Sequence, residues 1–359
     1  MRGKQRLLVI LTPIVAIALA LLVGAVIIAA LGKDPIRGYF MLFYGSLGSP
    51  QKIAQSLVTA CPLIFTSLAA AFAYKCGVYN LGGEGQFIMG AVAAAAFCAL
   101  TGVEGVAGTL GALAVGAAMG AAWGALPGVM KISRGLNEMI TSIMLNYVAT
   151  LFMGFVYTTA LRDGTTPQTP AVAESVQLAR MSDVFRIHPG VIIAVALAFV
   201  LYYVVFRTSF GFKIRAVGMN AEAARVNGFP VRRLVMLAFV ISGAIAGLGG
   251  SVELLGKQYR LMSGFGTGFG FDGVAIALIA QLNPIASLLV ALFFGVLRAG
   301  SIALQIAISV PTAIVDIIQA LVIIFAVAGV ALLNYPRFKQ FIQGAGLSGT
   351  AQKAEVSAK

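Results

Sequence analysis

Residues 7–31 form one apolar stretch with the sequence LLVILTPIVAIALALLVGAVIIAAL. The stretch holds no charged residue, and about 20 apolar residues are enough to cross the hydrocarbon core of a bilayer. A cleaved signal peptide has a shorter apolar core, of about 7–15 residues. The sequence therefore predicts an uncleaved first transmembrane helix, preceded by the basic residues of 1–6.

Similar apolar runs recur along the chain. They lie at roughly 53–74, 86–101, 106–130, 136–160, 189–206, 233–255, 268–282, 284–306 and 311–333. Hydrophobic residues make up 60% of the sequence and charged residues 10%, whereas a soluble domain is about a quarter charged. We expect an all-α integral membrane protein with about ten transmembrane helices, some of them broken, and the short Gly-rich run 268–282 is the clearest candidate for a partial span.

The basic residues predict the orientation of these helices. With the N-terminus inside, 16 of the 25 Lys and Arg residues lie in inner segments and eight in outer ones, while Arg298 falls within a span. Inner loops carry an excess of Lys and Arg, so both termini are predicted to be cytoplasmic and the protein to lie in the plasma (inner) membrane. Residues 1–335 form the predicted transmembrane domain, with an inner loop at 207–232 and an outer loop at 161–188. The polar tail 336–359 is predicted to be disordered.

Composition and motifs exclude several function classes. The net charge of +13 is spread between apolar runs, whereas nucleic-acid binding needs basic residues gathered on one soluble face. The three cysteines lie in or beside apolar stretches without a CxxC pattern, so we expect no metal site. No GxxxxGK[ST] pattern occurs, which predicts that this chain binds no ATP. We also expect it to bind no other cofactor. Its expected surroundings are membrane lipid.

A polar stripe runs along the helix predicted over 136–160. Glu138, Ser142, Asn146 and Thr150 recur at steps of four, with Asn137 and Thr141 beside them. A carboxylate or an amide inside a membrane is costly, so such groups face a water-filled path or a partner helix. Two interpretations stay open: the stripe lines a path for a solute, or it only joins helices by hydrogen bonds.

A second polar feature, residues 80–86, interrupts an apolar region. Its three glycines break a helix, and unpaired backbone in a membrane is tolerated only beside a cavity or inside the protein. A helix that restarts near Glu84 would point its positive end inward, although a tight cytoplasmic turn explains the same residues. The predicted substrate-path candidates are Asn80, Glu84, Asn137, Glu138, Ser142, Asn146 and Tyr147.

The inner loop contains a short, well-capped helix at residues 220–228. Asn220 suits the N-cap, Glu222 the first turn, Arg225 the last turn and Gly228 the position after the helix. Such a helix either docks on a partner or is an ordinary connector. The residues assigned to it are Asn220, Ala221, Glu222, Ala223, Ala224, Arg225 and Gly228.

Other residues carry smaller expectations. Glycines at 116, 120, 124 and 128 predict a groove for a closely packed helix. Asp272 either caps a helix or lines the path. The charged residues Glu253, Arg298 and Asp316, which lie inside predicted spans, are expected to be paired with one another or to lie at interfaces. His188, the single histidine, is expected to be solvated in the outer loop.

Several motifs resemble one family of transporters. They are residues 79–86 (YNLGGEGQ), 135–147 (GLNEMITSIMLNY), 216–224 with Gly228, and 270–278 (GFDGVAIAL). The chain resembles, over about residues 50–335, the permeases of branched-chain amino acid, ribose-type sugar and nucleoside ABC importers, with 135–147 closest to the nucleoside and simple-sugar branch. The outer loop 161–188 carries little that matches.

The resemblance implies a set of partners. They are a cytoplasmic ABC ATPase that binds ATP, a second permease subunit, identical or paralogous, and an extracytoplasmic solute-binding lipoprotein. Residues 220–228 would then be the helix that docks on the ATPase. The expected function is import of a small polar solute, foremost a nucleoside, by a chain that is not an enzyme. The alternatives are a ribose-type sugar permease and, in another class, an ion-coupled secondary transporter.

Overall fold

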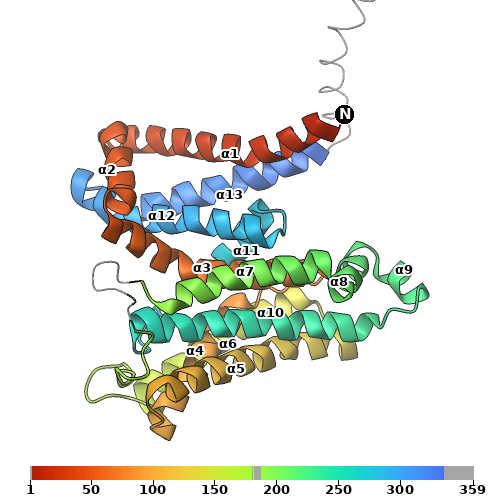
Figure 1. The fold of residues 1–359 in the computed structure, drawn as a ribbon. Helices are drawn as coiled ribbons and strands as arrows, with labels where there is room; N and C mark the ends of the chain where they lie inside the picture. Colours follow the sequence, from red (N-terminus) through yellow and green to blue (C-terminus); the bar gives the residue numbers. More distant parts are fainter. Residues whose placement is uncertain (1, 180, 182–186, 335–359) are drawn as a thin grey trace, which may run out of the picture. The chain divides into compact units, whose positions relative to one another are not determined.

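The computed structural model describes residues 2–179, 181 and 187–334, with side chains from residue 15 to residue 329. Over those residues the chain forms thirteen α-helices and two π-helical turns (Figure 1). The all-α prediction is therefore confirmed. The tail at 336–359, predicted to be disordered, lies outside the described residues.

The chain divides into two compact units. The first unit comprises residues 1–38 and 308–359, and the second unit comprises residues 39–307. In the first unit α1 (Arg2–Ala30) runs along α13 (Ala313–Asn334). Two helices begin in one unit and end in the other, α2 (Pro35–Leu47) and α12 (Pro284–Ile308).

The second unit holds the remaining helices. They are α3 (Pro50–Lys75), α4 (Gly83–Thr101), α5 (Gly105–Arg134), α6 (Glu138–Phe155) with the π-turn η1 (Val156–Ala160), α7 (Pro189–Arg207), α8 (Ser209–Met219), α9 (Ala221–Val226), α10 (Val231–Glu253) with the π-turn η2 (Leu254–Gln258), and α11 (Phe269–Ile279). The central helix is α3, whose apolar window is 94% buried, compared with 28% for α5.

The described residues include seven helices that are long and apolar enough to cross a membrane. Three shorter apolar helices, at Val15–Ala30, Phe269–Ile279 and Ala313–Gly329, coincide with three further predicted runs. The short predicted span at 268–282 thus corresponds to α11. The pattern is that of a multi-pass membrane protein.

Close packing of α5 on α10 confirms the predicted glycine groove. A Cβ added at Gly124 would come within 2.7 Å of the carbonyl oxygen of Phe239, and one added at Gly120 would clash with the backbone of Gly243. Both helices therefore approach backbone to backbone, as small residues permit in membrane bundles.

The described part of the loop 161–188 is anchored to the segment that follows α10 by backbone hydrogen bonds. Backbone N–H groups of Thr169, Val172 and Leu178 donate to the carbonyl oxygens of Leu261, Tyr259 and Leu255, at 2.8–3.0 Å. The expectation that His188 is solvated is wrong. Its side chain is 1% exposed and lies against Gly256, and burial, aided by the charge of Lys257, lowers its pKa to about 4.

Candidate functional site

The connection between α3 and α4, residues 76–82, is the centre of the candidate site. Its backbone is not helical, so its N–H and C=O groups need partners from elsewhere. Asn80, which is 2% exposed, bonds one of these backbone groups and two side chains. Its Oδ1 accepts from Gly82 N at 2.9 Å and from Gln86 Nε2 at 3.1 Å, and its Nδ2 donates to Ser242 Oγ of α10 at 3.0 Å.

The polar stripe of α6 completes this set of hydrogen bonds. Ser142 Oγ accepts from Leu81 N at 3.2 Å. Asn146 donates from Nδ2 to Leu81 O at 2.9 Å and accepts at Oδ1 from Gly85 N at 2.8 Å. Both side chains are buried, at 0% and 5% exposure. Helix α6 therefore satisfies the backbone of the α3–α4 break, which is the helix-joining interpretation of these two residues.

Glu84 connects the break to a second helix start. It lies in the first turn of α4, and its Oε2 accepts from Gly268 N, the N-cap residue of α11, at 3.1 Å. A Cβ at Gly270 would clash with the backbone of Glu84, so the two helix starts are in direct contact. The absence of a side chain at Gly270 permits this approach.

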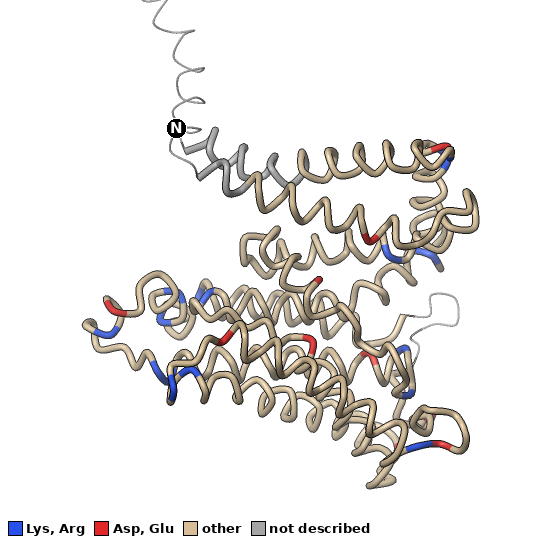
Figure 2. The backbone as a smooth tube through the Cα atoms, turned by 180° about the vertical axis from the view of Figure 1, so that it is seen from behind, with Lys and Arg blue, Asp and Glu red and all other residues tan. Residues whose placement is uncertain are grey.

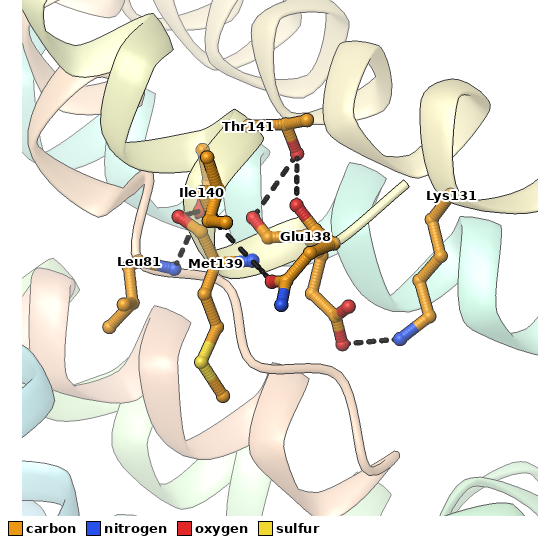
Figure 3. Close-up of polar contacts among 8 residues, drawn as sticks. Leu81, Lys131, Glu138, Met139, Ile140 and Thr141 are labelled. Carbon is orange, nitrogen blue, oxygen red and sulfur yellow. Dashed lines mark hydrogen bonds and ion pairs between the residues drawn. The ribbon is translucent and has the colours of Figure 1, made fainter. Parts of the chain in front are cut away.

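Three further path candidates lie at other positions of α6, and one of them, Glu138, contacts the break. Asn137 caps the helix, since its Oδ1 accepts from Met139 N at 2.9 Å. Glu138 forms an ion pair with Lys131 at the end of α5, and Figure 3 shows the pair on one side of the helix start with Thr141 on the other. Tyr147 is 64% exposed. The structure thus brings Asn80, Glu84, Ser142 and Asn146 together. It also connects Glu138 to the break, since the backbone of Tyr79 hydrogen-bonds its carboxylate, and it leaves Asn137 and Tyr147 apart.

Two members of the network were missed by sequence reasoning. Gln86 and Ser242 are each 1% exposed and both bond Asn80. Gln86 was within the noted motif, but Ser242 lies 162 positions from its partner. A hydroxyl in the apolar run of α10 was its only signal.

Helix α9 has the caps that the sequence predicts. Asn220 Oδ1 accepts from Ala223 N at 2.9 Å, Glu222 pairs with Arg225, and Gly228 has a φ of +80°. One residue assigned to the docking helix faces its own chain instead. Ala224 is 4% exposed and packs in a cluster with Tyr74 and Leu234. Exposed instead are Val226, at 80%, and Met219, at 87%.

The candidate site offers no metal chemistry. In the described part of the chain, no group of three or more His, Cys, Asp or Glu residues could hold a metal ion. Its groups are amides, hydroxyls and one carboxylate, which bind polar solutes by hydrogen bonds.

Comparison with known proteins places this arrangement in a family. Residues 52–327 match the model of the branched-chain amino acid transport system permease component. This chain belongs to that family. The permease is 34% identical to a guanosine ABC transporter permease of Bacillus subtilis, covering 91% of this chain and 96% of that one.

Two other relatives bear on the solute. A glucose ABC transporter permease of Haloferax volcanii is 32% identical, covering 90% of this chain and 88% of its own length. A second guanosine ABC transporter permease of Bacillus subtilis is 31% identical over 70% of this chain and 81% of its own. No solved structure matches the chain significantly.

Family membership confirms the predicted class of function. The chain is the membrane-spanning permease of an ABC importer, a transport subunit and not an enzyme. The break and the polar network therefore belong to the membrane-spanning part of a transporter.

Proposed function

We propose that this permease carries nucleosides into the cytoplasm. The observation that carries the proposal is the match to a guanosine permease over nearly the whole of both chains. The glucose permease of similar identity favours a sugar as the second candidate. Both solutes are uncharged and rich in hydroxyls, so both suit a path of amides and a carboxylate.

The path itself is proposed to pass the junction of α4, α6 and α11. Glu84 is its foremost lining residue, because it is only partly buried and lies where two helices begin. Asn80, Ser142 and Asn146 stabilise the conformation of the break by hydrogen bonds. A path-lining role for Asn137, Glu138 and Tyr147 stays a prediction.

The partners are proposed from the same family logic. A cytoplasmic ABC ATPase docks on α9, a solute-binding lipoprotein delivers the solute outside, and a second permease subunit completes the channel. The two guanosine permeases of one bacterium support a pair of different permeases. Residues 207–233, which contain α8 and α9, carry six Lys and Arg residues, which supports a cytoplasmic position for these helices. Figure 2 shows Lys and Arg at both ends of the second unit.

Competition for uptake tests the solute. Cells that express the complete transporter take up labelled guanosine, and unlabelled nucleosides, ribose or glucose are added in excess. We expect nucleosides alone to compete. Competition by glucose but not by nucleosides would transfer the assignment to sugars.

Labelling of single cysteines tests the orientation. In a background without Cys61, Cys76 and Cys98, an impermeant reagent should label Gln168→Cys in intact cells but not Gln352→Cys. Labelling of Gln352→Cys from outside would place the C-terminus on the wrong side.

A further inference from the structure

An ion pair joins α11 to α12 within the apolar bundle. Arg298 lies midway along α12, and its Nη1 is 3.6 Å from Oδ2 of Asp272 in the first turn of α11. Charged side chains at such a depth are costly and either pair with one another or face a polar path. The question is which of these two roles the pair has.

Arg298 lacks a hydrogen bond that an ion pair with a purely structural role would be expected to include. Buried ion pairs stabilise only when excellent geometry and further hydrogen bonds satisfy both partners. Among the described residues, Nη1 of Arg298 is buried and makes no hydrogen bond. The guanidinium lies 4.8 Å from the ring centroid of Phe269, which fixes its plane without using its N–H donors.

Both side chains also remain accessible. The side chain of Arg298 is 31% exposed and that of Asp272 is 27% exposed, whereas that of Glu253, at the end of α10, is 1% exposed. The guanidinium of Arg298 has five N–H donors, more than one ion pair uses, so it keeps hydrogen-bonding capacity for a ligand.

The pair lies next to the proposed path. Asp272 N donates to the carbonyl oxygen of Gly268, and Gly268 N donates to Glu84 at the α3–α4 break. A solute that passes Glu84 therefore comes within one helical turn of Asp272. Glu84 is thus connected to Asp272 through Gly268, and Asp272 pairs with Arg298.

We propose that Asp272 and Arg298 form a solute-contact site for the base edge of a nucleoside. Guanine is the matching base. Its adjacent N1–H and N2–H groups donate to the Asp272 carboxylate, while O6 and N7 accept from the guanidinium, which is the commonest bidentate pairing of Arg with a base. The inference rests on the proposed nucleoside function and makes it more specific.

The selectivity of uptake between nucleosides distinguishes a solute-contact site from an ion pair that only joins two helices. The complete transporter, with ATPase and receptor, is reconstituted in vesicles, and uptake of guanosine is compared with uptake of cytidine. Asp272→Asn and Arg298→Gln should each lower the guanosine-to-cytidine ratio by about 5- to 150-fold, since one bidentate base contact discriminates by about 1–3 kcal/mol. Because all variants use the same receptor, its own preference cancels in the comparison.

Two further variants keep the test decisive. The exchange Asp272→Arg with Arg298→Asp keeps an ion pair and should not restore the ratio. Arg298→Lys keeps the charge and favours assembly, but it cannot donate two parallel bonds, so it should still lose selectivity. Ser301→Ala is the control on the same helix, because that hydroxyl bonds only the carbonyl oxygen of Arg298, and its ratio should equal that of the wild type.

The outcomes separate this inference from the proposed function. Restoration by the charge exchange, or an unchanged ratio in Arg298→Lys, would overturn the contact site while nucleoside import stands. A wild-type transporter that imports no nucleoside would overturn the proposed function itself, and the contact site with it.

Discussion

Asn146 uses both ends of its amide to replace hydrogen bonds that a helix would make for itself. Its partners, Leu81 and Gly85, lie 65 and 61 positions away on either side of the start of α4. Asn146→Leu keeps the volume and leaves the partly buried C=O of Leu81 and the buried N–H of Gly85 without these partners. Each unsatisfied group costs about 1–3 kcal/mol. We predict a lower thermal unfolding midpoint of the purified permease and a loss of uptake.

The matched control is one turn further along α6. Thr150 Oγ1 bonds only the carbonyl oxygen of Asn146 within the same helix, so Thr150→Val should melt close to the wild type. Equal midpoints for Asn146→Leu and the wild type would show that the break needs no support from α6.

The residue types of this network could be predicted, but their partners could not. The spacing of Ser142 and Asn146 indicates one helix face, and the glycines of 80–86 indicate a break. That the first feature satisfies the second depends on the packing of α4 on α6, which local sequence does not encode. The pair of Asp272 and Arg298 was similarly out of reach, since its members lie on different helices.

Among the helices, α9 has features that its local sequence predicts and one that depends on packing against other helices. Its caps are local interactions within a few residues, so the sequence predicts them correctly. The direction of Ala224 depends on a cluster formed with α3 and α10. Ala224 therefore packs on its own chain, and the surface left for a partner is the one that carries Val226.

Val226→Glu tests the proposed docking of α9. An exposed apolar residue at a contact with an ATPase would be buried on assembly, and a carboxylate there would be left unpaired. Interface residues of this kind contribute about 2 kcal/mol or more, or roughly 30-fold in affinity. We predict that the ATPase no longer co-purifies with the permease, while the permease itself melts like the wild type.

The control for this prediction is Ala224→Glu. It places a carboxylate in the permease's own cluster and should lower the melting midpoint of the permease alone. Undiminished co-purification of the ATPase with Val226→Glu would remove α9 from the docking surface.

For the whole molecule, composition alone predicts the class. With 60% hydrophobic residues, only a membrane can solvate the outer faces of these helices, and helices satisfy their own backbone there. The run lengths then predict the spans, including the short α11. The contact between the starts of α4 and α11 could not be predicted, because it depends on glycines that meet across the bundle.

The central claim is that this chain is the permease of an ATP-driven nucleoside importer. The most direct measurement is accumulation of labelled guanosine in right-side-out vesicles that hold the complete transporter, with the receptor outside and with or without ATP inside. The account predicts accumulation only with internal ATP and no effect of an uncoupler. Full accumulation driven by an ion gradient without ATP would contradict it and identify a secondary transporter.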